Sequence, residues 1–194
     1  SIDGFDALII GCFYDPFLLD AREISGDMIV VGPCHCSIEI ALKLSNSFSV
    51  IIGQKKWQHE MQSTIIEYGF GEHLASFRDV GMTVPEFQED HKLTEEKLME
   101  AVRLAIDEDG AESIILGCTL EFGFFEKIQN TFNIPVIDPS IAALKQAEQA
   151  AILKNKFGWK PSRQWSTQAP PESDIKRYNL FDEEYQFGNR ITVK

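Results

Sequence analysis

The sequence has no long hydrophobic run, no cluster of basic residues and few cysteines. No apolar stretch approaches the roughly 18 residues that would indicate a membrane-spanning helix. The 30 acidic residues outnumber the 18 Lys and Arg, which gives a formal charge of -12. Nucleic-acid surfaces need clustered cations, so we expect no nucleic-acid partner and no membrane association. Four cysteines in 194 residues are too few for a disulfide framework.

Targeting and nucleotide-binding motifs are also missing. The segment Ser1–Gly11 has neither the basic region nor the small-residue cleavage site of a secretory signal. Gly53-Gln54-Lys55-Lys56 lacks the spacing of a phosphate-binding loop, and no G-x-G-x-x-G follows a strand-like run. We therefore expect a cytoplasmic protein that keeps its thiols reduced, binds a small molecule and uses no cofactor.

The sequence does contain a regular alternation of short apolar runs and helical patterns. The apolar runs cover residues 6–13, 28–33, 48–53, 75–82, 113–118 and 135–138. The helical patterns between them cover residues 16–25, 37–44, 57–68, 94–109, 120–132 and 141–157. Continuous apolar strands that alternate with helices are typical of parallel sheets covered on both faces, so we predict an α/β fold. Residues 158–194 contain several prolines and predict an extended tail that packs on the body through Trp159, Trp165 and Tyr178.

Two of the strand-like runs end in the same dipeptide, Gly-Cys. Asp6–Phe13 reads D-A-L-I-I-G-C-F and Glu112–Thr119 reads E-S-I-I-L-G-C-T. Ligands of open parallel sheets bind beyond the carboxyl ends of the strands, where Cys12 and Cys118 fall. A glycine before each cysteine lets the backbone approach a ligand, and a following helix start offers free amides. We expect such a position to lower the pKa of each thiol.

A pair of thiols can invert a carbon centre without any metal or coenzyme. One thiolate removes a proton from one face of the carbon, and the other thiol returns a proton to the opposite face. Backbone amides stabilise the enolate-like charge that develops between these steps. Because free cysteines are often buried, the alternative is that Cys12 and Cys118 are ordinary core residues. The repetition in matching contexts favours a catalytic pair.

Other polar residues near these strand ends have more ordinary explanations. Cys34-His35-Cys36 could suggest a metal, but zinc ligands are usually spaced by two or more residues, so we expect none there. Cys34 and His35 could instead line the mouth of a pocket or pack at a helix start. Asp15 and Asp138 each precede a proline at a predicted helix start, where we expect them to act as N-caps. Residues 121–125 predict a buried helix face, from which Phe122 could reach the pocket.

Four segments resemble those of the aspartate/glutamate/hydantoin racemase superfamily. They are Gly11-Cys12-Phe13-Tyr14-Asp15-Pro16, Val31-Gly32-Pro33, Leu116-Gly117-Cys118-Thr119 and Pro135-Val136-Ile137-Asp138-Pro139. The closest likeness is to its hydantoin and allantoin racemase branch, whose first cysteine motif has the form Cys-Phe-x-Asp-Pro. The likeness extends from about Asp3 to about Ala151.

The resemblance implies racemisation of 5-substituted hydantoins or allantoin, with Cys12 and Cys118 as acid and base. Relatives racemise aspartate or glutamate, isomerise maleate or decarboxylate arylmalonates, and a non-catalytic binding protein is a further alternative. The candidate substrate-binding residues are Gly11, Phe13, Pro33, Cys34, Gly117 and Thr119. The resemblance also implies two similar lobes. We assign residues 1–33 and about 135–157 to the first lobe, 34–134 to the second and 158–194 to the tail.

The chain departs from the family pattern in two places. Members begin with a further segment that contains a strand and a substrate loop, so we expect the first lobe to lack its opening portion. A shortened lobe would expose a sheet edge, which favours a homo-oligomer. The hydantoin branch also has Gly and Glu after the proline, where this chain has Cys34 and His35. This second departure leaves the exact substrate open.

Overall fold

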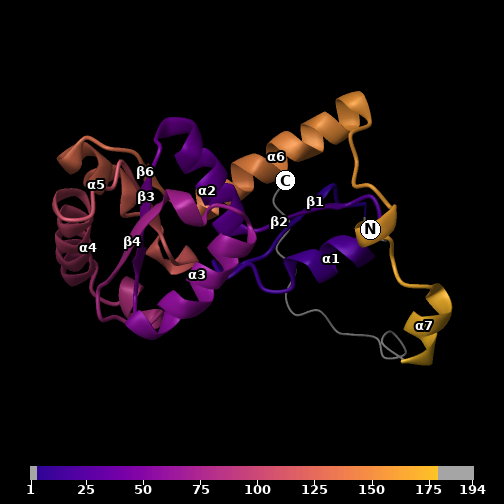
Figure 1. Ribbon diagram of the computed structural model, residues 1–194, viewed down its shortest axis with the longest axis horizontal. Helices are drawn as coiled ribbons and strands as arrows, with labels where there is room; N and C mark the ends of the chain where they lie inside the picture. The colour runs from indigo at the N-terminus through magenta and orange to yellow at the C-terminus, as the bar shows by residue number, and fades with distance from the viewer. Residues whose placement is uncertain (1–3, 179–194) are drawn as a thin grey trace.

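Two parallel sheets form the frame of the structure, a computed structural model that describes residues 4–178 (Figure 1). The smaller sheet pairs β1 with β2, and the larger has the order β4-β3-β5-β6. The strands are β1 (Ala7–Ile9), β2 (Ile29–Val31), β3 (Phe48–Ile52), β4 (Leu74–Asp79), β5 (Ser113–Leu116) and β6 (Val136–Ile137). The predicted α/β fold with parallel sheets flanked by helices is confirmed.

The helices are α1 (Leu18–Ile24), α2 (Pro33–Leu44), α3 (Gln58–Glu67), α4 (His91–Asp107), α5 (Phe125–Phe132), α6 (Pro139–Phe157) and α7 (Glu172–Arg177). Helices α2 to α5 cover the two faces of the large sheet, and α6 connects it to the small one, whereas α1 packs on β2 and α7 lies in the tail (Figure 1). Single 3-10 turns lie between them: η1 (Lys55–Trp57), η2 (Gly71–His73), η3 (Pro85–Gln88), η4 (Thr119–Glu121) and η5 (Trp165–Thr167). Within residues 4–178, none of these helices is long and apolar enough to cross a bilayer.

Strand β3 explains why the sequence shows continuous apolar runs. All five of its residues are buried, and alternate side chains enter different cores. Val50 and Ile52 pack in the core that α2, α3 and α6 cover, whereas Ile51 packs in the core under α4 and α5. Successive side chains of a strand point to opposite faces, so a strand covered on both sides needs apolar residues on both of its faces.

Helix α6 links the two sheets. It starts at the end of β6 and packs on α2, β1 and β2 (Figure 1). Its buried positions Ala142, Ala143 and Ala147 have small side chains, which allow the helix to lie close to its neighbours. Further along, Lys154 pairs with Asp6 at 3.0 Å. Asp138 caps the helix by accepting hydrogen bonds from the amides of Ser140 and Ile141, as the sequence predicts.

Several predicted boundaries differ from the structure. The helix predicted over 120–132 is split, because η4 ends at Glu121 and Gly123 adopts a φ of 90° before α5 begins. Helix α4 begins three residues before Thr94, since Asp90 caps it through the amides of Lys92 and Leu93. Strand β6 pairs with β5, so it belongs to the large sheet and not with residues 1–33, where we expected it. The remaining division into lobes stays a prediction.

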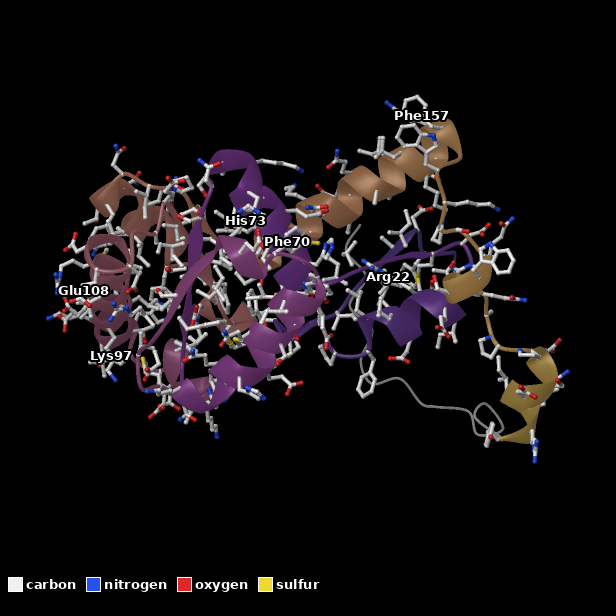
Figure 2. The ribbon with its side chains drawn as sticks, viewed as in Figure 1. Arg22, Phe70, His73, Lys97, Glu108 and Phe157 are labelled. Atoms are coloured by element: carbon white, nitrogen blue, oxygen red, sulfur yellow. The ribbon has the colours of Figure 1, made fainter. Side chains whose placement is uncertain are left out.

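The tail does not pack through its aromatic residues. Trp159, Trp165 and Tyr178 are 65%, 89% and 70% exposed, so that prediction was wrong. Arg163 holds the tail instead by donating to Ser25 Oγ and to the backbone of α1. In the same region Arg22 donates from α1 to the Val30 carbonyl oxygen of β2 at 3.1 Å (Figure 2). Residues 179–194 of the predicted tail lie outside the described residues.

Candidate active site

Cys12 and Cys118 line one cavity of about 190 Å³ at the ends of β1 and β5. Four of the six predicted substrate-binding residues line it as well: Gly11, Phe13, Gly117 and Thr119. Thr119 also ties the two strand ends together, because its hydroxyl donates to the Gly11 carbonyl oxygen at 3.3 Å. Two segments separated by more than 100 positions in the sequence therefore meet around a single space.

The two glycines before the cysteines are not equivalent. A Cβ atom on Gly117 would lie 2.5 Å from the carbonyl oxygen of Ile51, so the close packing of β5 against β3 requires glycine there. A Cβ atom on Gly11 would have no atom of the described residues within 4 Å. Close approach of the backbone therefore explains Gly117, whereas open space surrounds Gly11.

The electrostatics of Cys118 differ from the sequence-based expectation. Burial raises the pKa of its thiol to about 11, although we expected a lowered value. The amide of Leu120 opposes this rise by donating to Cys118 Sγ at 3.4 Å, whereas negative charge on Glu121 or Cys12 would raise the pKa further. Burial disfavours the charged thiolate more than one amide stabilises it. Cys118 is therefore mostly protonated at neutral pH, as suits a thiol that donates a proton.

Asp15 acts as a cap, but for a different helix from the one that the sequence indicates. Its buried carboxylate accepts hydrogen bonds from the amides of Cys34 at 3.0 Å and His35 at 2.9 Å, which lie in the first turn of α2. The Tyr68 hydroxyl donates to the same carboxylate at 3.0 Å. Burial raises the pKa of Asp15, and these three hydrogen bonds oppose the rise. The prediction that Asp15 caps the helix after Pro16 was wrong.

Asp15 thus links the turn after Cys12 to the start of α2. The turn itself is closed by the Asp15 amide, which donates to the Cys12 carbonyl oxygen at 3.0 Å. Gly32 leaves room for the carboxylate, because a Cβ atom there would lie 2.3 Å from Asp15 Cγ. Asp15, which connects the cysteine loop to α2, is therefore held in place by packing as well as by hydrogen bonds.

The structure does not bring Pro33 and Cys34 to the cavity. Both are buried at the start of α2, and neither is among the residues that line the space between the thiols. Burial also raises the pKa of Cys34 well above its usual range. Phe122, another candidate, is 48% exposed and likewise does not line the cavity. Among residues 4–178, no group of three His, Cys, Asp or Glu side chains could hold a metal.

Five further residues line the cavity that the sequence did not identify. They are Tyr14, Trp57, Met61, Val84 and Leu120, and they come from separate loops and helices. Tyr14 carries the one phenol among them, and burial, together with the nearby Cys12, Glu60 and Cys118, raises its pKa to about 12. Its hydroxyl therefore stays protonated and able to donate a hydrogen bond. The other four add apolar side chains to the lining of the cavity.

Comparison with known proteins places this chain in one family. The family model for Asp/Glu/Hydantoin racemase matches residues 2–147, and the chain belongs to this family.

Among its relatives, the chain is 34% identical to hydantoin racemase from Rhizobium meliloti over 75% of this chain and 60% of that protein. It is 34% identical to hydantoin racemase from Paenarthrobacter aurescens over 86% of this chain and 69% of that protein. The structure resembles that of allantoin racemase from Klebsiella pneumoniae, with a TM-score of 0.81 and 27% identity. That match covers 88% of this chain and 68% of the other. The chain thus spans only about 60% of the length of the first of these relatives.

Proposed function

We propose that this chain is a cofactor-independent racemase of hydantoin-type substrates, with Cys12 and Cys118 as its acid and base. The observation that carries the proposal is the convergence of both thiols on one cavity at equivalent strand ends. The identity to two hydantoin racemases supports the same substrate class.

In the proposed reaction the acidic carbon of the hydantoin ring lies between the two sulfur atoms. The thiolate of one cysteine takes the proton from that carbon, and the thiol of the other returns one to the opposite face. Negative charge moves to the neighbouring carbonyl oxygen in between, where a hydrogen-bond donor stabilises it. Tyr14, whose hydroxyl remains protonated, is the donor that we assign to this task. The roles of Cys12 and Cys118 exchange for the other enantiomer.

The apolar lining favours hydantoins with an aliphatic or aromatic substituent at the acidic carbon. Trp57, Met61, Val84 and Leu120 offer no side-chain acceptor to a polar substituent, and polar groups without partners lose binding energy on burial. Allantoin, whose substituent is a polar ureido group, is the second candidate. The likeness to the Klebsiella pneumoniae allantoin racemase is the observation in its favour.

Polarimetry on single enantiomers of 5-benzylhydantoin and allantoin tests both parts of the proposal. We expect racemisation of 5-benzylhydantoin above the spontaneous rate, and its loss in Cys12→Ser and in Cys118→Ser. Cys36→Ser is the control, because Cys36 is buried away from the cavity, and circular dichroism checks the fold of each variant. Full activity in both cavity variants would rule out the two-thiol mechanism, whereas faster turnover of allantoin would select the second candidate. Homo-oligomerisation and a cytoplasmic location stay predictions.

A further inference from the structure

Glu121 is a buried acid for which the proposed reaction has no direct use. It ends the single turn η4 that follows Cys118, and its side chain is completely buried. Its amide donates to the Cys118 carbonyl oxygen at 3.0 Å, so the acid is anchored to the cysteine by the backbone. Among the described residues, neither carboxyl oxygen has a hydrogen-bond partner. A fully buried polar group without a partner is rare and requires a physical reason.

The groups around Glu121 do not favour its ionised form. Cys118 and Asp138 are the titratable groups that interact with it electrostatically, and both are acidic. On the side of η3, Gln88 donates its amide to the carbonyl oxygens of Leu120 and Phe122, and so holds the backbone on either side of Glu121. His91 of α4, which is exposed, contacts the Phe124 ring in a tilted arrangement with ring centroids 5.4 Å apart.

Burial therefore decides the charge of this carboxyl. It raises the pKa of Glu121 well above its usual range. The nearby amides of Gly117 and Cys118 oppose this rise only weakly, because neither forms a regular hydrogen bond with the carboxyl oxygens and the Gly117 amide donates to the Ile51 carbonyl oxygen. A carboxylate in the interior with no cation beside it is strongly disfavoured, and the group responds by keeping its proton. Burial therefore favours the protonated form of Glu121 in the folded protein.

We propose that Glu121 is a positioning residue that controls the protonation of Cys118: the neutral acid permits the thiolate, and the ionised acid suppresses it. The proposal rests on the acid/base role that the proposed function gives to Cys118. Its physical basis is the short separation along the turn and the complete burial of Glu121 beside the partly buried Cys118, since like charges repel more strongly where water is excluded. The carboxylate raises the pKa of the Cys118 thiol, whereas the protonated carboxyl does not.

The coupling predicts a particular difference between the wild-type protein and Glu121→Gln, which is permanently neutral and almost the same shape. The rate at which iodoacetamide alkylates Cys118 reports its thiolate fraction, and peptide mass spectrometry separates Cys118 from the other cysteines. At pH 7 to 8 the two proteins should react at rates within about twofold of each other. At alkaline pH, where Glu121 of the wild type loses its proton, the wild type should fall at least about threefold behind the variant.

Two results would overturn the proposal. Identical profiles at every pH would show that Glu121 only fills space, and a difference already present at pH 7 would show that it is charged there. Glu126→Gln is the matched control, because it makes the same substitution at an exposed position of α5. Circular dichroism at each pH confirms that the proteins remain folded. The measurement needs no substrate, so a failure of the proposed racemase activity would be seen separately by polarimetry.

Discussion

Replacing Asp15 should reveal how strongly the Cys12 loop is attached to the rest of the protein. Asp15→Ala removes the acceptor for the amides of Cys34 and His35 and for the Tyr68 hydroxyl. Asp15 also adopts a φ of 51°, a left-handed conformation that aspartate and asparagine tolerate better than alanine.

The expected loss follows from these contacts. Loss of a helix cap costs about 1 kcal/mol, and a buried donor left without an acceptor costs about 1–3 kcal/mol. The strain of alanine in the left-handed region adds about 1–2 kcal/mol. We therefore expect Asp15→Ala to lower the free energy of unfolding by about 3–5 kcal/mol. Asp15→Asn keeps one acceptor oxygen and the tolerated backbone, so it should cost about 1–2 kcal/mol at neutral pH.

The pH dependence of the difference between wild type and Asp15→Asn provides a second check. Burial raises the pKa of Asp15 in the folded state above its ordinary value of 3.8. The folded state then holds this proton more tightly than the unfolded state does. The contribution of protonated Asp15 to the free energy of unfolding is therefore complete below pH 3.8. It is lost as the pH rises through the pKa of Asp15 in the folded state. The difference in free energy of unfolding between the wild type and Asp15→Asn should therefore become smaller over that pH range.

Urea unfolding followed by circular dichroism measures these free energies. Asp20→Ala is the matched control, because Asp20 is an exposed aspartate on the neighbouring helix α1, and its change should stay within about 0.5 kcal/mol. A double-mutant cycle of Asp15→Ala with Tyr68→Phe should show coupling of about 1 kcal/mol. A loss below about 1 kcal/mol in Asp15→Ala, or strict additivity with Tyr68→Phe, would refute the role of this hydrogen-bond network.

Two further substitutions test the cavity. Gly117→Ala should destabilise the protein by about 3 kcal/mol, because its Cβ atom would meet the Ile51 carbonyl oxygen. Gly11→Ala, which has open space around it, should leave the urea midpoint unchanged. Equal midpoints for the two variants would contradict the packing at Gly117. Tyr14→Phe should lower kcat for hydantoin racemisation by about tenfold or more, because it removes the hydrogen-bond donor that we assign to the developing oxyanion. The fold should stay intact. An unchanged kcat in that variant would exclude Tyr14 from the reaction.

The sequence predicted the sheet well because its signal is local. Strands β3 and β5 at the centre of the large sheet are covered on both faces, so they are mainly apolar and could be recognised without knowledge of their neighbours. The Gly-Cys ends followed from the same strands. Features that depend on distant residues were less accessible: the helix after Cys118 is interrupted at Gly123, and Asp15 caps α2 across 19 positions.

The cavity shows the same limit. Its thiols lie at strand ends, which the order of strands and helices already indicates. Trp57 and Val84 come from loops after β3 and β4, and only the assembled sheet brings them near Cys118. The pKa of Cys118 was also beyond the sequence, because it depends on how completely the surrounding residues exclude water. Pro33, which resembled a pocket residue in its motif, is buried at the start of α2 instead.

The central claim, that two thiols act on opposite faces of one carbon, is tested most directly by hydrogen exchange in D2O. Each enantiomer of 5-benzylhydantoin would be incubated with Cys12→Ser and with Cys118→Ser, and deuterium at the acidic carbon followed by NMR. We predict that each variant exchanges one enantiomer without inverting it, and that the two variants select opposite enantiomers. Exchange of both enantiomers by either variant, or the same preference in both, would contradict the account.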